Sequence, residues 1–337
     1  MNCCPNCFND AFLTSVINQK SNHKATCDFC NTEDIYIIDT KRLNDYFQPL
    51  LDLYEPSDDN GKPIVHLLKN DWVLFTSLND EKAIELLESI FDLSFQGLFI
   101  SKQNGNEGRI LNWQDFKTEL KHDNRYFPKK APSYEHLNGL LQFIILPNAD
   151  IPKYLYRSRV NIDTEIIDIV KMGKPPEKIS TAGRANPIGI PYLYTASNIK
   201  TAIAEIRPHK GDNITVATFE AKESLTLADL RNPRESISPF ELDEDGLNQI
   251  FIDLGYLCHL GDELSKPILP REAHLEYLSS QYLCELIKHC GYDGVIYKSS
   301  VGDGDNYAIF SDNKLEVIEI NVYSVDNVEI TSKPIDI

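Results

Sequence analysis

The sequence predicts a mixed α/β (α+β) domain at the C-terminal side, preceded by a mostly α-helical N-terminal region that carries a zinc ribbon. Three observations predict this. Two Cys-x2-Cys pairs lie near the N-terminus, apolar residues then recur at helical spacing, and helix and strand patterns mix after residue 147. With 337 residues, of which 42% are hydrophobic, the chain can bury more than one core. We place the boundaries at residues 1–40, 41–147 and 148–337.

Charge and hydropathy exclude several classes of function. Lys and Arg number 33 against 51 Asp and Glu, so the net charge is −18 and the field of the protein repels polyanions. We therefore expect no general nucleic-acid binding. No apolar run reaches the roughly 18 residues that span a bilayer, and the first residues lack the pattern of a secretory signal. The expected location is the cytoplasm, without membrane association and with reduced thiols.

The four cysteines of the N-terminal segment predict a structural metal site. Cys4 and Cys7 form one Cys-x2-Cys pair, and Cys27 and Cys30 form a second pair, separated from the first by 19 residues. Two such pairs close a tetrahedral zinc site, and four protein ligands leave no open position for catalysis. Cys3 and His23 are alternative ligands, but the regular spacing favours Cys4.

The middle region predicts several amphipathic helices, followed by a break. Apolar residues recur at helical spacing in residues 43–54, 83–91 and 113–120. His66, His122 and His136 lie in this region without a neighbour at metal-ligand spacing, which favours an ordinary surface role. Pro147 and Pro152 then interrupt any helix, so the boundary falls there.

The C-terminal region alternates strands, helices and Gly-bearing loops. Arg157 ends a short strand pattern, where its guanidinium suits an anion clamp. Arg184 leads a loop with two glycines and two prolines, and Tyr194 lies in the strand that follows. Ser197 is the expected N-cap of a helix that ends near Glu205. Further elements are expected as a helix at 279–290, strands at 295–297, 306–310 and 315–320, and a polar loop at 298–304.

Four ordered blocks resemble a known family, the RES domain, named for an Arg, a Glu and a Ser. They are Leu-Tyr-Arg at 155–157, Gly-Arg-Ala-Asn-Pro-Ile-Gly-Ile-Pro-Tyr-Leu-Tyr-Thr-Ala at 183–196, Thr-Ala-Ile-Ala-Glu at 201–205 and Gly-Tyr-Asp-Gly-Val-Ile-Tyr-Lys-Ser-Ser at 291–300. The resemblance covers residues 150–325. It implies a fold like that of ADP-ribosyltransferase toxins and a toxin that degrades NAD by hydrolysis or phosphorolysis. Residues 41–147 are similar to HEPN-like domains but lack the Arg and His pair of a HEPN ribonuclease.

The resemblance implies roles for seven residues. The expected catalytic residues are Arg157, Glu205 and Ser299, and the expected ligand-binding residues are Arg184, Tyr194, Ser300 and Asn306. A carboxylate such as that of Glu205 stabilises the oxocarbenium-like sugar that forms when nicotinamide leaves. Arginines suit the diphosphate, Tyr194 the nicotinamide ring or a ribose oxygen, and Ser299 the ribose or the nucleophile.

Two positions depart from the family pattern. Ala185 replaces the usual aromatic residue after the loop arginine, which loosens stacking on a base or on nicotinamide. Lys298 replaces the proline before the serine, which leaves Ser299 and Ser300 as alternatives.

The leading hypothesis is an NAD glycohydrolase or NAD phosphorylase that acts as a toxin or anti-phage effector. NAD is then the substrate, inorganic phosphate a candidate co-substrate, zinc a structural metal, and an antitoxin or regulatory protein an expected partner of a homo-oligomer. One alternative is an ADP-ribosyltransferase that modifies a macromolecule, and another is a non-catalytic zinc-ribbon binding module. In the purely structural interpretation Glu205 pairs with Arg207, and Glu220, Asp229 and Arg231 stabilise the fold.

Overall fold

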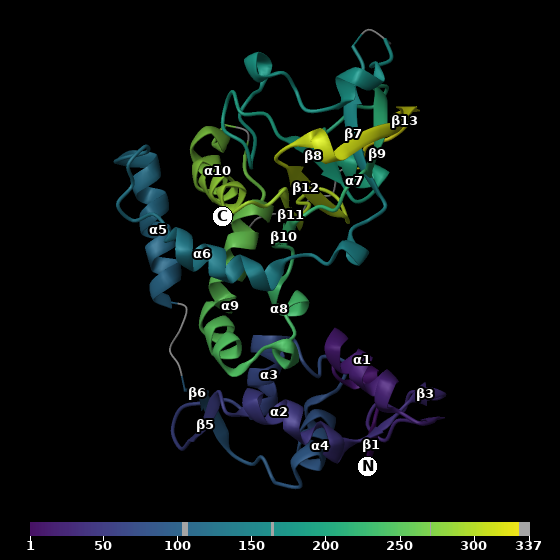
Figure 1. The fold of residues 1–337 in the computed structure, drawn as a ribbon, viewed down its shortest axis with the longest axis vertical. Helices are drawn as coiled ribbons and strands as arrows, with labels where there is room; N and C mark the ends of the chain where they lie inside the picture. Colours follow the sequence, from purple (N-terminus) through teal and green to yellow (C-terminus); the bar gives the residue numbers. More distant parts are fainter. Residues whose placement is uncertain (103–106, 163–164, 270, 330–337) are drawn as a thin grey trace. The chain divides into compact units, whose positions relative to one another are not determined.

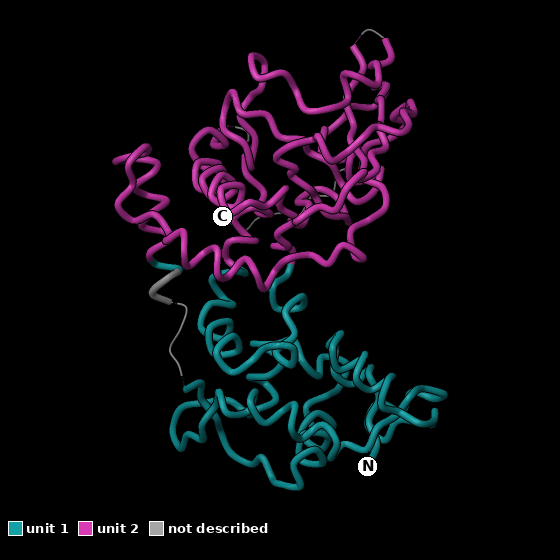
Figure 2. The backbone as a smooth tube through the Cα atoms, in the orientation of Figure 1, with its two compact units in different colours: residues 1–111, 232–258 teal, residues 112–231, 259–337 magenta. Residues whose placement is uncertain are grey.

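The structure, a computed structural model, describes residues 1–102, 107–162, 165–269 and 271–329. They form two compact units, and each unit combines two separate stretches of the chain (Figure 2). Unit 1 comprises residues 1–111 and 232–258, and unit 2 comprises residues 112–231 and 259–337. Helix α9 (Glu244–Ser265) therefore contributes residues to both units.

Unit 1 is mainly helical and contains the cysteine-rich segment. Three of its rings, Phe8, Phe47 and Phe75, lie within 5.7 to 5.9 Å of one another and form an aromatic core. Two of its helices begin at polar side chains that accept from the backbone: Asp10 accepts from the amide of Leu13, and Asn79 accepts from the amide of Lys82. The helices are α1 (Ala11–Lys20), α2 (Asn44–Leu51), α3 (Ile64–Trp72), α4 (Asp80–Phe91) and α8 (Pro233–Ser236).

Short antiparallel strand pairs complete unit 1. The pairs are β1 (Asn2–Cys3) with β4 (Ile38–Asp39), β2 (Lys24–Ala25) with β3 (Ile35–Tyr36), and β5 (Tyr54–Ser57) with β6 (Leu98–Ser101). The expected helices at 43–54 and 83–91 correspond to α2 and α4, so the helical periodicity predicted these two elements correctly.

Unit 2 is built on a seven-stranded mixed sheet in the order β10-β11-β12-β8-β7-β9-β13 (Figure 1). All neighbouring strands are antiparallel except β10 and β11, which are parallel. This confirms the mixed α/β class. The strands are β7 (Tyr154–Val160), β8 (Leu193–Ala196), β9 (Asn213–Ala221), β10 (Leu227–Asp229), β11 (Gly294–Lys298), β12 (Asp305–Ile309) and β13 (Leu315–Ser324).

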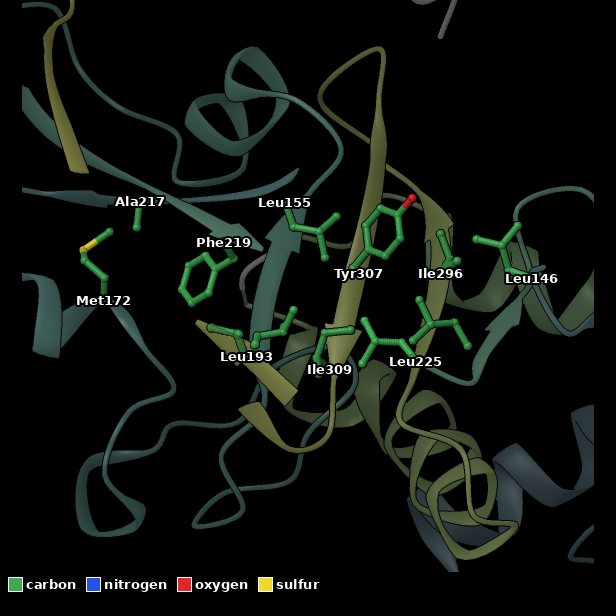
Figure 3. Packing of buried hydrophobic residues seen from close by; sticks show 12 residues of the cluster. Leu146, Leu155, Met172, Leu193, Ala217, Phe219, Leu225, Ile296, Tyr307 and Ile309 are labelled. Atoms are coloured by element: carbon green, nitrogen blue, oxygen red, sulfur yellow. The ribbon is translucent and has the colours of Figure 1, made fainter. Parts of the chain in front are cut away.

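One apolar cluster holds the seven strands together. Every strand contributes at least one buried side chain, among them Leu155 of β7, Leu193 of β8 and Phe219 of β9 (Figure 3). Burial of this apolar surface is the main driving force for forming the sheet. Helix α7 (Ile199–Glu205) packs on β7, β8 and β9, and α10 (Ala273–His289) packs on β11.

Two further helices are α5 (Glu107–His122), most of which belongs to unit 2, and α6 (Tyr134–Leu141) of unit 2. A buried ion pair joins α5 to the last turn of α9, because the Lys117 ammonium lies 2.8 Å from the Glu263 carboxylate with both side chains less than 10% exposed. None of the described helices is long and apolar enough to pass through a membrane.

Candidate active site

The sheet of unit 2 divides between its two central strands. In the described residues, β7 and β8 share a single register pair, Tyr156 with Ala196. Beyond that pair β7 continues along β9, from Arg157 with Ala217 to Val160 with Ile214, while β8 pairs with β12. The two halves therefore separate after Tyr156, and a cavity of about 250 Å³ lies at this point of separation.

Arg157 lies where the strands separate. Its Nη1 donates to the backbone carbonyl of Tyr194 at 3.0 Å, and its buried Nε has no hydrogen-bond partner among the described residues. Burial, and then the nearby charge of Arg159, lower the pKa of Arg157 to about 10, so the guanidinium remains a cation at neutral pH. No carboxylate of the described residues lies within 4.0 Å of it. A buried cation without a carboxylate partner is suited to an anionic ligand.

Glu205 lines the same cavity from the end of α7. Its Oε1 accepts from the Ser299 hydroxyl and from the Asn306 side-chain amide, both at 2.6 Å. No described residue donates to Oε2, and no cation of the described part of the chain pairs with this carboxylate. The expected alternative pairing with Arg207 is absent from the described contacts. Glu205 is thus held at one oxygen and open at the other.

The hydroxyl of Ser299 is fixed by its own turn. It accepts from the backbone amides of Val301 at 3.2 Å and Gly302 at 3.0 Å while donating to Glu205. This pattern makes Ser299 a positioning residue for the carboxylate. Ser300 instead lines a neighbouring cavity of about 400 Å³.

Arg184 lies in that neighbouring cavity, away from Arg157. Its Nη1 donates to the carbonyl of Lys266 at 2.7 Å, and its guanidinium lies 5.4 Å from the centre of the Tyr277 ring. The cavities of Arg157 and Arg184 share Glu205, Tyr194 and Asn306 as lining residues. Six of the seven residues predicted from the sequence therefore line two adjoining cavities, and the seventh, Ser299, contacts Glu205 from outside the lining. Their roles stay predictions.

The loop that carries Arg184 is held by Asn186, which the sequence interpretation did not single out, and by Tyr194, for which it expected a ligand-binding role. Asn186 is 3% exposed, and its Nδ2 donates to the carbonyls of Thr181, Pro187 and Ile190 at 2.9 to 3.1 Å. The Tyr194 hydroxyl donates to Asn186 Oδ1 at 2.8 Å and accepts from the amides of Ala185 and Asn186. With these three contacts made inside the protein, the Tyr194 hydroxyl holds the loop, and its side chain lines both cavities.

Helix α10 anchors the same loop from the other side. Gln281 Nε2 donates to the carbonyl of Gly183 at 2.8 Å, and the Ser280 hydroxyl donates to the carbonyl of Arg184 at 2.7 Å. Gly183 is required here because a Cβ would lie 2.5 Å from Asn186 Oδ1 and 2.6 Å from the Tyr194 hydroxyl. A polar Ser-Gln pair on the buried face of a helix was the sequence signal for these anchors.

The start of α7 differs from expectation. Asn198, not Ser197, caps the helix, since its Oδ1 accepts from the amide of Thr201 at 2.8 Å. The Ser197 hydroxyl is taken by the amide of Asp305 at 3.0 Å, which fixes the start of β12. Arg231 forms ion pairs with Asp229 and Asp305 at 2.6 and 2.9 Å, the structural role expected of it.

In unit 1 the four predicted cysteines come together. Their sulfur atoms all lie within 4.8 Å of one another. The Sγ–Sγ distances are 3.4 Å for Cys4 and Cys30, 3.5 Å for Cys7 and Cys27, and 3.9 Å for Cys4 and Cys7. Zinc bonded tetrahedrally to sulfur at about 2.3 Å separates the sulfurs by about 3.8 Å, so the donor set fits zinc. Cys3 lies outside the cluster and its thiol donates to the carbonyl of Ile38 at 3.8 Å.

The site thus consists of two adjoining cavities that share the Glu205 carboxylate, one with Arg157 in its lining and the other with Arg184. Residues 170–330 match the sequence model of the RES domain, and this part of the chain belongs to the RES domain family. No curated protein matches the chain. Among solved structures, a chain of the M. tuberculosis MbcT-MbcA toxin-antitoxin complex matches with 13% identity, 56% coverage of this chain, 93% coverage of that chain and a TM-score of 0.33. This is a weak likeness, and no conclusion rests on it.

Proposed function

We propose that the RES domain consumes NAD by cleaving the N-glycosidic bond between nicotinamide and ribose. The family match supports an NAD-consuming toxin in general terms, and the site supports the choice of bond. The observation that carries the proposal is Glu205, which is held at Oε1 and open at Oε2 in a cavity that also contains an unpaired Arg157.

The chemistry follows from the charges of the reactants. Nicotinamide is cationic in NAD and leaves as a neutral ring, so the departing group needs no general acid. The positive charge that develops on the ribose is stabilised by the Glu205 carboxylate, and the open Oε2 also accepts from a ribose hydroxyl. Ser299 and Asn306 keep the carboxylate in place, which lowers the cost of reorganisation in the transition state. Arg157 and Arg184 bind the anionic diphosphate.

The acceptor of the ribosyl group is water or inorganic phosphate in this proposal, which makes the enzyme an NAD glycohydrolase or an NAD phosphorylase. The proposal also includes zinc in the cysteine cluster and NAD depletion as the toxic or anti-phage effect. It further includes an antitoxin or regulatory partner, a homo-oligomer, a cytoplasmic location and a HEPN-like origin for residues 41–147.

The test follows the products of NAD over time with and without phosphate. Chromatography resolves nicotinamide, ADP-ribose and ADP-ribose-1″-phosphate, and adenylate-labelled NAD reveals any transfer to a macromolecule. We expect nicotinamide release by the wild-type chain and a loss of about 10²- to 10³-fold in Glu205→Gln, as is usual when one electrostatic contact to the transition state is removed.

The matched control is Glu220→Gln. Glu220 is a carboxylate of the same sheet that lies 3.7 Å from Lys153 and lines none of these cavities. Folded wild-type protein that releases no nicotinamide under either condition would refute the assignment, as would an equal loss in both variants. Label found on protein or nucleic acid would replace hydrolysis by ADP-ribosyl transfer.

A further inference from the structure

A third cavity of unit 2, of about 450 Å³, adjoins the active site, and several of its lining residues carry side-chain donors without a described partner. It shares Arg157 and Tyr194 with the cavity of Glu205, and it extends along β7 to Arg159 and across to the segment before the Arg184 loop. We call it the Arg159 pocket, after the arginine that lines this cavity and neither of the other two.

The charge of the Arg159 pocket is opposite to that of the whole protein. Arg157 and Arg159 are two positions apart on β7, so their side chains lie on the same face of the strand, and both line the pocket. No Asp or Glu is among its lining residues, although the chain as a whole carries −18. Asp312, which acts on Arg157 electrostatically, is instead paired with Lys174 at 3.6 Å and does not line the pocket.

The pocket also contains buried donors without partners. The hydroxyls of Ser180 and Tyr192 have no hydrogen-bond partner among the described residues, although these residues are only 5% and 1% exposed. The Nε of Arg157 is likewise buried and has no hydrogen-bond partner among the described residues. A buried donor that stays unpaired costs folding free energy, so several of them around one cavity indicate a ligand that accepts from all of them.

We propose that the Arg159 pocket is a binding site for a phosphate group. A phosphate group supplies several strong acceptor oxygens and negative charge, which match two guanidinium groups and neighbouring hydroxyl donors. The group has two chemical sources, free inorganic phosphate or the diphosphate of a nucleotide. In its link to the reaction this inference rests on the proposed function, because Arg157 and Tyr194 then join the phosphate site to the carboxylate that faces the ribose.

The test is calorimetric titration of the full-length wild-type chain with inorganic phosphate and, separately, with ADP. We expect saturable binding of at least one probe and a loss of about tenfold or more in Arg159→Gln, since a charge-assisted contact is removed. Arg271→Gln is the matched control, because the Arg271 side chain is 79% exposed and lies outside the pocket, and its affinity should stay within about twofold.

A second variant separates binding from folding. Arg159 also donates to the carbonyl of Gly173 at 3.1 Å, so its replacement affects the fold as well. Ser180→Ala removes a hydroxyl that has no described partner. We expect this variant to unfold at the same or a higher urea concentration than wild type and yet to bind the probe several-fold more weakly.

The outcomes distinguish the sources and the two proposals. Binding of inorganic phosphate that depends on Arg159 assigns the pocket to free phosphate, and dependence seen with ADP alone assigns it to the nucleotide diphosphate. Wild-type protein that binds neither probe, or affinities unchanged in both Arg159→Gln and Ser180→Ala, would overturn the inference. NAD cleavage measured in parallel keeps the tests separate, because a chain that cleaves NAD without Arg159-dependent binding retains the proposed function and loses only this site.

Discussion

Tyr192, just before β8, and Tyr194, within it, should respond differently to loss of the side-chain hydroxyl. Tyr194 makes three hydrogen bonds through its hydroxyl, one to Asn186 Oδ1 and two from backbone amides. Tyr192 is more deeply buried, at 1% exposed, but its hydroxyl has no partner among the described residues. Burial raises the pKa of both phenols, so each hydroxyl stays protonated at neutral pH.

The expected sizes follow from this count. A neutral hydrogen bond contributes about 0.5 to 1.5 kcal/mol net, so the loss of three of them makes Tyr194→Phe less stable by about 1.5 to 4.5 kcal/mol. Tyr192→Phe removes an unpaired buried group, and its free energy of unfolding should be unchanged or higher by up to about 1 kcal/mol.

The assay uses the placement of the two tryptophans. Trp72 belongs to unit 1 and Trp113 to unit 2, and both are 2% exposed. In a Trp72→Phe background the fluorescence change during urea unfolding reports on unit 2 alone. This matters because a chain with two units need not unfold in one step. Equal destabilisation by the two Tyr→Phe substitutions, or a larger loss for Tyr192→Phe, would refute the hydrogen-bond assignment of the loop.

Three further predictions concern the cysteine cluster and the buried ion pair. Metal analysis should find about one zinc per chain, lost in Cys27→Ser and retained in Cys3→Ser, and retention in both would refute the four-cysteine site. Lys117→Met should lower the free energy of unfolding by about 3 kcal/mol, because the buried Glu263 carboxylate loses its partner on α5. Lys130 is exposed, so Lys130→Met should lower it by less than about 1 kcal/mol. Similar losses for the two variants in urea unfolding would contradict this. Burial raises the pKa of Glu263, but Lys117 and Lys266 more than offset it and the pKa lies below its ordinary value. The stabilisation by this pair is therefore present above the ordinary carboxyl pKa of about 4.3 and is lost as the pH falls below it, so the difference between wild type and Lys117→Met should shrink in acid.

Local patterns predicted much of the fold and missed particular elements. Spacing alone predicted the cysteine cluster, because two short knuckles carry all four ligands. Strand β9 was missed since its residues 214–219 are all buried, so the alternation that marks a half-exposed strand is absent. Helix α9 was missed although apolar residues recur along it, and its division between two units follows from long-range packing that no local pattern contains.

The candidate site likewise contains residues that the sequence predicted and residues that only the folded structure revealed. Ordered motifs predicted that Arg157 and Glu205 belong to one site, and the structure brings both to one cavity, which Asn306, from outside the motifs, also lines. The choice between Ser299 and Ser300 depends on backbone amides two and three residues further on, which orient one hydroxyl toward the carboxylate. The Ser180 and Tyr192 donors were invisible in the sequence, since being unpaired is a property of the folded surroundings and not of a residue type.

Because β7 separates from β8, Arg157 also has a structural role beside its proposed role in ligand binding. Where the strands stop pairing, its guanidinium donates a hydrogen bond to the Tyr194 carbonyl and so connects the two halves of the sheet. A ligand that attracts this guanidinium weakens its hydrogen bond to the Tyr194 carbonyl. Ligand binding in the cavity therefore changes how firmly the two halves of the sheet are held together. The rate of amide hydrogen exchange along residues 193–196 should therefore change on ligand binding, even in a variant that no longer cleaves NAD.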